Sequence, residues 1–425
     1  IRFCICRNTE NVWRSWSRAS KMPSATEERR SGSLHIDIMV YIKHCETYDK
    51  NAVLEAVRQI FDACGTLEGI AGLTVAVKPN LVSRKKPECA ATTHPAVVWA
   101  VCRLCREAGA RVVIAESPGG FYDAGSLRAT YKTCGIEEAA RESGAELNFD
   151  TSETQVENPN GKYLKKLNIL TPLARADRVI NLAKLKTHGM MTYTGAVKNM
   201  FGAIAGLEKA EYHLQLSDYD EFADCIIDIF LAVKPVFHLI DAVVGMHRDG
   251  PTAGEPYPLG TLLGGSDAFE LDLAGARLIR ADYRRIPVLR RAAESGLVKT
   301  EPDAISFAGD ALIPAKDFVI KYNDSLKKLH FADGIFGRLL AGAIRPRPVF
   351  DRALCRGCGE CVKCCPAKVI RLVPSPEGKK TKPAGRSFAQ VDLSGCIRCY
   401  CCQELCPFRA VRIKRPLLNR LVIRR

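Results

Sequence analysis

The stretch CRGCGECVKCCPAKVI, residues 355–370, sets the architecture of the C-terminal part of the chain, and CIRCYCCQELCPFRAV, residues 396–411, repeats its pattern. Each copy fits the spacing C-x2-C-x2-C-x3-C-P. The cysteines on the pattern are Cys355, Cys358, Cys361 and Cys365 in the first copy and Cys396, Cys399, Cys402 and Cys406 in the second. Thiolates two residues apart can hold one compact metal centre, while the proline turns the chain away after the fourth ligand.

Paired runs of this kind are typical of bacterial ferredoxins, in which the fourth cysteine of each run binds the cluster of the other run. The sequence therefore predicts two 4Fe-4S clusters with crossed ligands. The predicted sets are Cys355, Cys358, Cys361 and Cys406 for cluster one, and Cys396, Cys399, Cys402 and Cys365 for cluster two. Cys364 and Cys401 fall off the pattern and are expected to be bystanders. Zinc is the competing interpretation, but structural zinc usually takes two C-x2-C pairs separated by a loop.

Cysteine usage also indicates the compartment. Ten of the 19 cysteines lie between residues 355 and 406. Such clustering favours metal ligation in a reducing setting over a disulfide framework, which belongs to short secreted chains. No apolar run reaches the roughly 18 residues that span a bilayer. We therefore expect a cytoplasmic protein without a transmembrane segment.

The formal net charge of +15 is concentrated at the C-terminal end. Residues 345–425 contain nineteen Lys or Arg and five Asp or Glu, which leaves fourteen positive charges in excess. Thiolate-bound clusters are anionic, so these residues are expected to act largely as counter-charge. A basic docking face for an acidic redox partner protein is also compatible with them. Nucleic-acid binding is disfavoured, because no helix-turn-helix, RNP or zinc-finger pattern accompanies the charge.

The chain divides into five segments. Residues 1–38 show no periodicity and begin without methionine, so a disordered or non-native leader is expected before a natural start near Met39. The further segments are expected to be an α/β domain at 39–325, a connector with an apolar helical stripe at 326–350, a small α+β ferredoxin-like domain at 351–415 and a basic tail at 416–425.

Apolar strand-like runs alternate with amphipathic helical patterns in the long second segment. Strands are predicted in residues 73–81, 110–118, 176–185, 236–246 and 259–265, and helices in 94–110, 135–145 and 218–234. This alternation is typical of an α/β fold whose mostly parallel sheet carries helices on both faces. Ligands of such sheets bind where strands end and loops begin.

Polar side chains follow three of these strands. Lys78 and Asn80 come after the first, ahead of Thr93 and His94 and a helix that begins at Pro95. Thr93 could equally cap that helix or bind a ligand.

The second group is the most concentrated. Lys184, Lys186, His188, Lys198 and Asn199 lie within sixteen residues between apolar flanks. Buried lysines need anionic partners, and the nearby chain offers only two glutamates, Glu208 and Glu211. We therefore expect a small anionic substrate carrying carboxylate or phosphate, with solvated loop charges as the alternative. The residues expected to bind it are Lys78, Asn80, Thr93, Lys186, Lys198 and Asn199.

The candidates for proton transfer are His94 and His188, because imidazole titrates near neutrality. The third polar group contains Asp241, Asp267 and Asp272, of which Asp267 is expected to be a helix N-cap. No G-x-G-x-x-G follows a strand and no P-loop motif occurs, which disfavours the usual dinucleotide and P-loop chemistry.

Three segments resemble a known family. VKPNLVSRKKPECAATTHPAV (77–97), AKLKTHGMMTYTGAVKNMFGAIAGL (183–207) and IDAVVGMHRDGPTAGEP (240–256), followed by the paired cysteine runs, look like the domain of unknown function 362 joined to a two-cluster ferredoxin domain. The resemblance covers nearly everything from Met39 to about Leu421, and it implies this architecture and cluster binding but no reaction. More distantly, residues 186–206 are similar to a stretch of the nickel-pincer lactate racemase family, which favours a small anionic substrate and carries over no nickel site.

Two functional interpretations follow. In the first, the protein is a cytoplasmic iron–sulfur oxidoreductase whose clusters exchange electrons with an external donor and with an anion held by the α/β domain. In the second, it is an electron-transfer or sensing protein that has no catalytic site in that domain. Binding of a small molecule by the α/β domain would separate the two.

Overall fold

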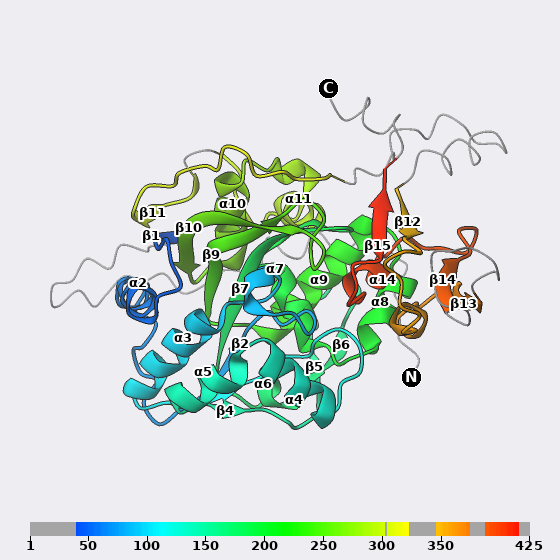
Figure 1. The fold of residues 1–425 in the computed structure, drawn as a ribbon. Coiled ribbons are helices and arrows are strands. Elements are labelled where there is room, and N and C mark those ends of the chain that lie inside the picture. Colours follow the sequence, from blue (N-terminus) through cyan, green and yellow to red (C-terminus); the bar gives the residue numbers. More distant parts are fainter. Residues whose placement is uncertain (1–39, 302–303, 323–345, 375–386, 416–425) are drawn as a thin grey trace, which may run out of the picture.

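The computed structural model describes residues 40–301, 304–322, 346–374 and 387–415 (Figure 1). The expected leader, most of the connector and the basic tail lie outside these ranges. Within the described ranges, no helix is long and apolar enough to cross a membrane.

A nine-stranded sheet forms the centre of the α/β body, the part of the chain up to residue 322. Its order is β11-β1-β10-β9-β7-β2-β3-β4, with β8 paired to β7 beside this row. Five of its eight strand pairs are parallel, which confirms the expected mostly parallel sheet. The strands are β1 (Val40–His44), β2 (Thr74–Lys78), β3 (Arg111–Ile114), β4 (Glu146–Leu147), β7 (Arg178–His188), β8 (Thr192–Thr194), β9 (Phe237–His247), β10 (Glu255–Gly265) and β11 (Phe307–Gly309). A separate hairpin contains β5 (Glu153–Glu157) and β6 (Lys166–Leu170).

Helices cover both faces of the large sheet, as the alternating pattern predicts. One layer contains α2 (Lys50–Ala63), α3 (Pro95–Glu107) and α5 (Ile136–Ser143), and the other contains α7 (Ala196–Asn199), α9 (Tyr219–Val233), α10 (Ala268–Leu278) and α11 (Pro287–Glu294). The body also contains α4 (Ala124–Thr133), α6 (Thr171–Ala174) and α8 (Glu208–Gln215). Successive residues of β2 serve the two layers, since Val77 belongs to the core under α3 and Ala76 to the core under α9. A strand buried on both faces has to be apolar throughout.

The strand order creates a crevice at one edge of the sheet. From β2 the chain continues to β3 on one side, whereas β7 lies on the other side, and all three strands are parallel. Ligands of open α/β sheets bind at the carboxyl ends of strands where the order reverses in this way. Lys78 ends β2 and His188 ends β7 at this edge.

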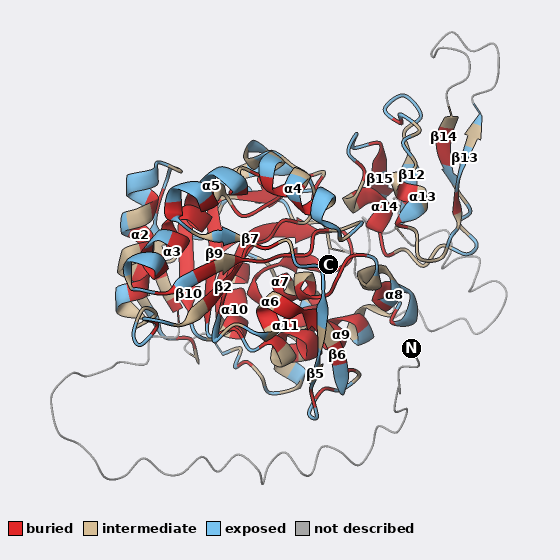
Figure 2. Cartoon of the chain, turned by 90° about the horizontal axis from the view of Figure 1, so that it is seen from below, coloured by how far each residue is buried: buried red, intermediate tan, exposed pale blue. Residues whose placement is uncertain are grey.

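The C-terminal part of the chain forms a small ferredoxin-like unit at one end of the body (Figure 2). Its elements are β12 (Arg347–Phe350), α13 (Glu360–Lys363), β13 (Ile370–Pro374), β14 (Ser387–Val391), α14 (Cys401–Glu404) and β15 (Val411–Lys414). β12 pairs antiparallel with β15, and β13 pairs antiparallel with β14. β13 and β14 lie between the two cysteine copies in the sequence, and β12 and β15 flank them. Two strand pairs with two short helices give the expected small α+β fold.

The two cysteine copies share one backbone shape. Gly357 and Gly359 have φ angles of 69° and 79°, and forty-one residues later Arg398 and Tyr400 have φ angles of 58° and 64°. Residues that carry a Cβ rarely adopt this left-handed backbone conformation. The repeat therefore keeps its conformation even where glycine is replaced.

The ferredoxin-like unit packs directly on the body. Gln403 Nε2 donates to the Asp249 carbonyl oxygen at 2.8 Å, and Thr252 Oγ1 donates to the Glu404 carbonyl oxygen at 2.8 Å. Ile413 of β15 belongs to the main apolar core of the body. These contacts fix the unit beside the crevice at the carboxyl ends of the strands.

We predict that Leu182→Ala destabilises the protein by about 2 to 5 kcal/mol, the usual cost of deleting a buried leucine side chain. Leu182 is 0% exposed in the middle of β7, between β2 and β9. The free energy of unfolding from urea titration measures the loss. Leu214→Ala, at a leucine that is 44% exposed, is the matched control. Equal losses in the two variants would contradict the placement of β7 in the core.

Candidate functional site

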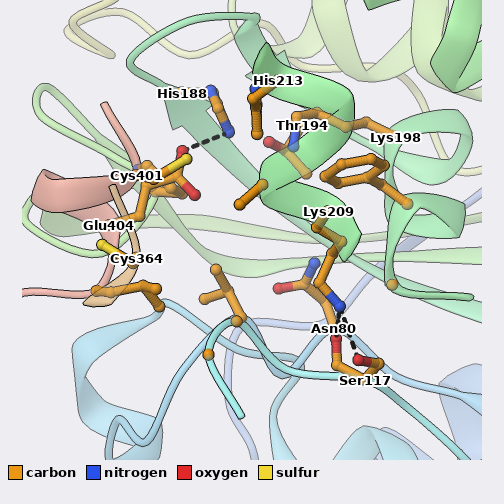
Figure 3. A pocket seen from close by; sticks show the side chains of 18 of the residues that line it. Asn80, Ser117, His188, Thr194, Lys198, Lys209, His213, Cys364, Cys401 and Glu404 are labelled. Carbon is orange, nitrogen blue, oxygen red and sulfur yellow. Dashed lines mark hydrogen bonds and ion pairs between the residues drawn. The ribbon is translucent and has the colours of Figure 1, made fainter. Parts of the chain in front are cut away.

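A pocket of about 810 Å³ lies between the α/β body and the ferredoxin-like unit (Figure 3). We name it the interdomain pocket. The body contributes residues that follow the carboxyl ends of β2, β3 and β7. The ferredoxin-like unit contributes Cys364, Cys401, Glu404 and Leu405. Of the residues expected to bind or act on a ligand, those that line the pocket are Asn80, Lys186, His188, Lys198 and Asn199.

A chain of hydrogen bonds holds Lys186 in the pocket wall. Its Nζ donates to Asn80 Oδ1 and to the Ala91 carbonyl oxygen, both at 2.6 Å. Asn80 Nδ2 donates to Asn199 Oδ1, and Asn199 Nδ2 donates to Asn181 Oδ1, both at 2.8 Å. Burial lowers the pKa of Lys186 well below its usual range, and the nearby Lys198 lowers it further. Its hydrogen-bond partners are neutral oxygens, so none of them cancels its charge when it is protonated.

Lys78 does not line the pocket. Its ammonium forms a buried ion pair with Glu116, which follows β3 and lines the pocket. Gly202 packs against this pair, because a Cβ there would lie 2.2 Å from Glu116 Oε1 and 2.7 Å from Lys78 Nζ. Lys78 therefore positions Glu116 and does not itself face the pocket.

Two further lysines line the pocket from α7 and α8. Lys209 Nζ donates to Ser117 Oγ at 2.7 Å, to the Ser117 carbonyl oxygen at 2.8 Å and to the Ile204 carbonyl oxygen at 2.7 Å. Burial lowers the pKa of Lys209 to about 7. Lys198, by contrast, forms no hydrogen bond or ion pair within the described ranges, and its Nζ lies 5.7 Å from the centre of the Phe201 ring. Among the described residues, Lys198 is thus the pocket lysine with all its donors available.

His188 faces the ferredoxin-like unit from the end of β7. Its Nδ1 accepts hydrogen bonds from the backbone N–H groups of Met190 and Met191, both at 3.1 Å, so the proton of the neutral ring is on Nε2. Nε2 lies 3.1 Å from Glu404 Oε1 (Figure 3). Burial lowers the pKa of His188 to about 4, and Lys198 contributes to the shift. Burial alone would raise the pKa of Glu404, but His188 and Lys198 bring it down to about 2.

Apart from Glu404 Oε1, which pairs with His188, two buried polar atoms of the pocket wall have no hydrogen-bond partner in the described part of the chain. They are Thr194 Oγ1 and His213 Nδ1. His213 stacks on Phe222 with ring centroids 4.2 Å apart, and burial lowers its pKa to about 3. Leaving a buried polar atom unsatisfied costs about 1 to 3 kcal/mol. Such atoms in a cavity wall are suited to bind a ligand.

Cys364 and Cys401, which fall off the cysteine pattern, both line the interdomain pocket. Cys401 also lines the cavity that contains Cys396, Cys399 and Cys402. It therefore lies in the wall between the two spaces. The expectation that both cysteines are bystanders to the clusters stays a prediction, and the structure adds their position in the pocket wall.

Thr93 and His94 take structural positions away from the pocket. Thr93 Oγ1 accepts from the Asn80 backbone N–H at 2.9 Å and donates to the Leu182 carbonyl oxygen at 2.8 Å, so it braces the turn after β2. His94 caps α3 through Nδ1 and stacks on Tyr48 with centroids 3.5 Å apart. The structure therefore does not bring these two predicted residues to the site.

The residues of the third polar group, Asp241, Asp267 and Asp272, make structural contacts within the α/β body. Asp241 accepts from Lys184 Nζ at 2.8 Å, and both side chains are buried. Asp267 is the N-cap of α10, as expected from its position before the helix. Asp272 accepts from the backbone N–H of Val197 at 3.1 Å and so fixes the start of α7, which carries Lys198.

The eight pattern cysteines line two cavities of the ferredoxin-like unit, of about 330 Å³ and 340 Å³. Among the described residues, no three Cys, His, Asp or Glu side chains converge on a site for a single ion. The thiols instead surround two larger spaces. Cys355, Cys358, Cys361 and Cys406 line the first cavity, and Cys365, Cys396, Cys399 and Cys402 line the second. These are the two crossed sets of the sequence analysis, and their binding of clusters stays a prediction.

The residues around these cavities fit an anionic cluster. The backbone N–H of Ala389 donates to Cys355 Sγ at 3.5 Å, and that of Ala410 donates to Cys406 Sγ at 3.3 Å. Hydrogen bonds to sulfur stabilise thiolate ligands and tune cluster potentials. Gly357 permits the close backbone approach, because a Cβ there would lie 2.6 Å from the Ser387 carbonyl oxygen.

Sequence reasoning missed several residues of the interdomain pocket. Glu116 and Ser117 follow β3 directly, so the same rule that selected Lys78 and Asn80 could have found them. Lys209, His213 and Glu404 carry no comparable signal. They reach the pocket only through the packing of α8 and of the ferredoxin-like unit.

We predict that His213→Phe makes stability less sensitive to acid. The pKa of His213 is about 3 in the folded protein against 6.5 for a free imidazole, so the unfolded chain binds the extra proton. The stability that the neutral ring provides is complete above pH 6.5 and is lost as the pH falls toward the folded value. Phenylalanine keeps the stack on Phe222 and removes the titrating group. Urea midpoints measured from pH 7 to about 4.5 should fall less steeply than in the wild type, and an identical slope would contradict the assignment.

Comparison with known proteins agrees with this architecture. Residues 75–277 match the family model of the domain of unknown function DUF362, and residues 354–410 match that of a 4Fe-4S dicluster domain. The thylakoid-associated protein sll1697 of Synechocystis sp. is 28% identical over 270 residues, which are 61% of this chain and 80% of that protein.

Two solved structures are more distant. The lactate racemase apoprotein from Thermoanaerobacterium thermosaccharolyticum is 15% identical, with a TM-score of 0.36 over 57% of this chain and 56% of its own. A structural-genomics protein from Thermotoga maritima is 12% identical, with a TM-score of 0.30 over 51% of this chain and 55% of its own. This chain thus spans little more than half of either solved chain. From the family matches, the chain joins a DUF362 domain to a C-terminal iron–sulfur-binding 4Fe-4S dicluster domain.

Proposed function

We propose that the protein is an iron–sulfur oxidoreductase that couples electron transfer through two 4Fe-4S clusters to a small anionic compound bound in the interdomain pocket. One observation carries the proposal: Cys401 lies in the wall of both the pocket and the cavity of the second cysteine set. A ligand in the pocket would therefore lie one side chain away from that cavity. A protein that only passed electrons between partners would need no polar pocket at this position.

The cluster ligands are proposed from the cavities and the crossed spacing. Cys355, Cys358, Cys361 and Cys406 would hold cluster one, and Cys396, Cys399, Cys402 and Cys365 would hold cluster two. When bound, such clusters supply electrons singly at potentials set by their surroundings.

The lysines that line the pocket favour a ligand with negative charge, although Glu116 and Glu404 line it as well. Lys198 offers an ammonium without a described partner, and Thr194 Oγ1 and His213 Nδ1 add polar atoms without partners. Lys186 lies in the same wall, held by neutral oxygens. A carboxylate or phosphate group would accept hydrogen bonds from the half-buried Lys198 ammonium, which among the described residues feels the Glu404 carboxylate but forms no direct ion pair with it. We therefore propose that Lys198 binds the anion, with Asn80, Asn199 and Lys186 shaping the wall beside it.

Of the two predicted histidines, the proposal keeps His188 for proton transfer, because it reaches the pocket and His94 does not. Its Nε2 proton faces Glu404, and its ring is neutral near pH 7 because the pKa is lowered to about 4. The pair can thus hold a proton at the boundary between the pocket and the ferredoxin-like unit.

An anaerobic redox titration followed by EPR tests the coupling. We expect reversible reduction of two clusters, and a more negative midpoint potential for cluster two when the pocket holds an anion, because added negative charge opposes reduction. Clusters that cannot be reduced would contradict electron transfer. Potentials that ignore every small carboxylate and phosphate would favour an electron-transfer protein with no catalytic site in the body.

We predict that Lys198→Met weakens binding of the anion by about 10- to 100-fold, the usual value of one hydrogen bond to a charged group. Calorimetric titration with a panel of small carboxylates and inorganic phosphate measures the loss. Lys132→Met, at an exposed lysine of α4 outside the pocket, is the matched control. Unchanged affinity in Lys198→Met would remove this residue from the site.

A further inference from the structure

The ferredoxin-like unit has two unlike faces. Its inner face contacts the body through Tyr400, Gln403 and Ile413, which are 8% exposed or less. Its outer face surrounds the cavity of the first cysteine set, and the described residues that line this cavity all belong to the ferredoxin-like unit. The β13–β14 hairpin is the part of the unit farthest from the large sheet in both views (Figures 1 and 2).

The outer face combines apolar and basic side chains. Leu354, Leu372 and Phe408 are 38%, 40% and 42% exposed. An exposed group of large apolar side chains is informative where it forms a patch rather than occurring singly. Cys358 is the exposed member of the first cysteine set. We name the outer patch by its residues: Arg356, Cys358, Leu372 and Phe408, which line the cavity, and their exposed neighbours in the sequence Leu354 and Arg409.

Positive charge dominates around this patch. The described part of the ferredoxin-like unit, residues 346–374 and 387–415, contains eleven Lys or Arg against four Asp or Glu. Arg356 and Arg409 are exposed, and neither forms an ion pair with a residue in the described ranges. The basic surface continues onto the body at Lys85, whose pKa is lowered first by burial and then by the nearby Arg409. Glu360 also lines the cavity but is paired with Lys363, so the excess of positive charge favours a partner that brings negative charge.

We propose that the outer patch is the electron-entry surface, where a small acidic electron-carrier protein docks and reduces cluster one. The reduced centre of the carrier protein would give up one electron, and the oxidised cluster held by the first cysteine set would gain it. The apolar side chains would form the dry centre of the contact and the arginines its steering rim, as in weak redox complexes that bury less than about 1,200 Å². The inference rests on the cluster ligation proposed above, but not on the identity of the pocket ligand.

The test uses the full cluster-loaded chain with a plant-type [2Fe–2S] ferredoxin as the acidic carrier. Arg356→Glu/Arg409→Glu reverses two charges of the patch. Lys132→Glu/Lys165→Glu makes the same change in net charge at two exposed lysines of the body. Two quantities are measured: the affinity for oxidised ferredoxin at several salt concentrations, and the rate at which reduced ferredoxin bleaches the cluster absorbance.

We expect the patch variant to lose about tenfold or more in both affinity and rate at low salt. The control variant should stay within about twofold of the wild type, and binding should weaken as salt rises. Dithionite should reduce all three proteins equally. If dithionite fails to reduce even the wild type, the cluster proposal itself is at fault, and the affinities still report on docking.

Several outcomes would overturn the inference. The patch variant could bind ferredoxin like the wild type, or both variants could lose affinity equally. A basic cytochrome c could bind as well as the acidic carrier. Tight salt-dependent binding of duplex DNA without binding of ferredoxin would assign the patch to a nucleic acid instead.

Discussion

Burial of lysine ammonium groups at the carboxyl ends of β2 and β7 is the constraint on which the site depends. A buried charge is tolerated only when polar partners surround it. Lys78 meets Glu116, Lys184 meets Asp241, and Lys186 meets neutral oxygens of the turn after β2 and the loop before α3. These partners come from distant parts of the sequence. The same contacts that compensate for burial therefore tie the loops of the crevice together. Among the residues that the structure describes, they leave Lys198 as the pocket lysine without a hydrogen-bond partner.

The second requirement is the ferredoxin-like unit itself. Glu404, Cys364 and Cys401 complete the pocket wall, and Glu404 lies opposite His188 across the boundary. The pocket thus exists only when both parts are joined. An isolated α/β body would expose His188 to water, whereas in the full chain the ring is 4% exposed and its pKa is low. Fusion of the two parts in one chain has a direct structural reason here.

Much of this architecture could be predicted from the sequence, because it follows from local rules. The strands and helices of the body follow apolar periodicity, and the two cysteine sets follow a spacing in which each copy completes the other. Asn80 was found because it follows β2. The group of Lys186, His188, Lys198 and Asn199 was found because it is polar and concentrated after a predicted strand, although in the structure β7 extends to His188 and α7 contains Lys198 and Asn199. Lys209 and His213 could not be found, since their places depend on how α8 packs. Thr93 and His94 satisfy the same local rule, but nearby backbone groups and Tyr48 engage their side chains instead.

The shared backbone of the two cysteine copies has a consequence for how the halves of the unit have diverged. A left-handed residue with a Cβ costs about 1 to 2 kcal/mol relative to glycine. The copy that faces solvent keeps Gly359, whereas the copy that faces the body has Tyr400 in the same conformation, 1% exposed and donating to the Pro346 carbonyl oxygen at 3.0 Å. The strained conformation thus occurs where the Tyr400 ring anchors the second cysteine copy in the apolar core of the body. The two copies of the pattern are therefore not interchangeable in the folded chain, because one is anchored in the core of the body and the other surrounds a cavity lined by the ferredoxin-like unit alone.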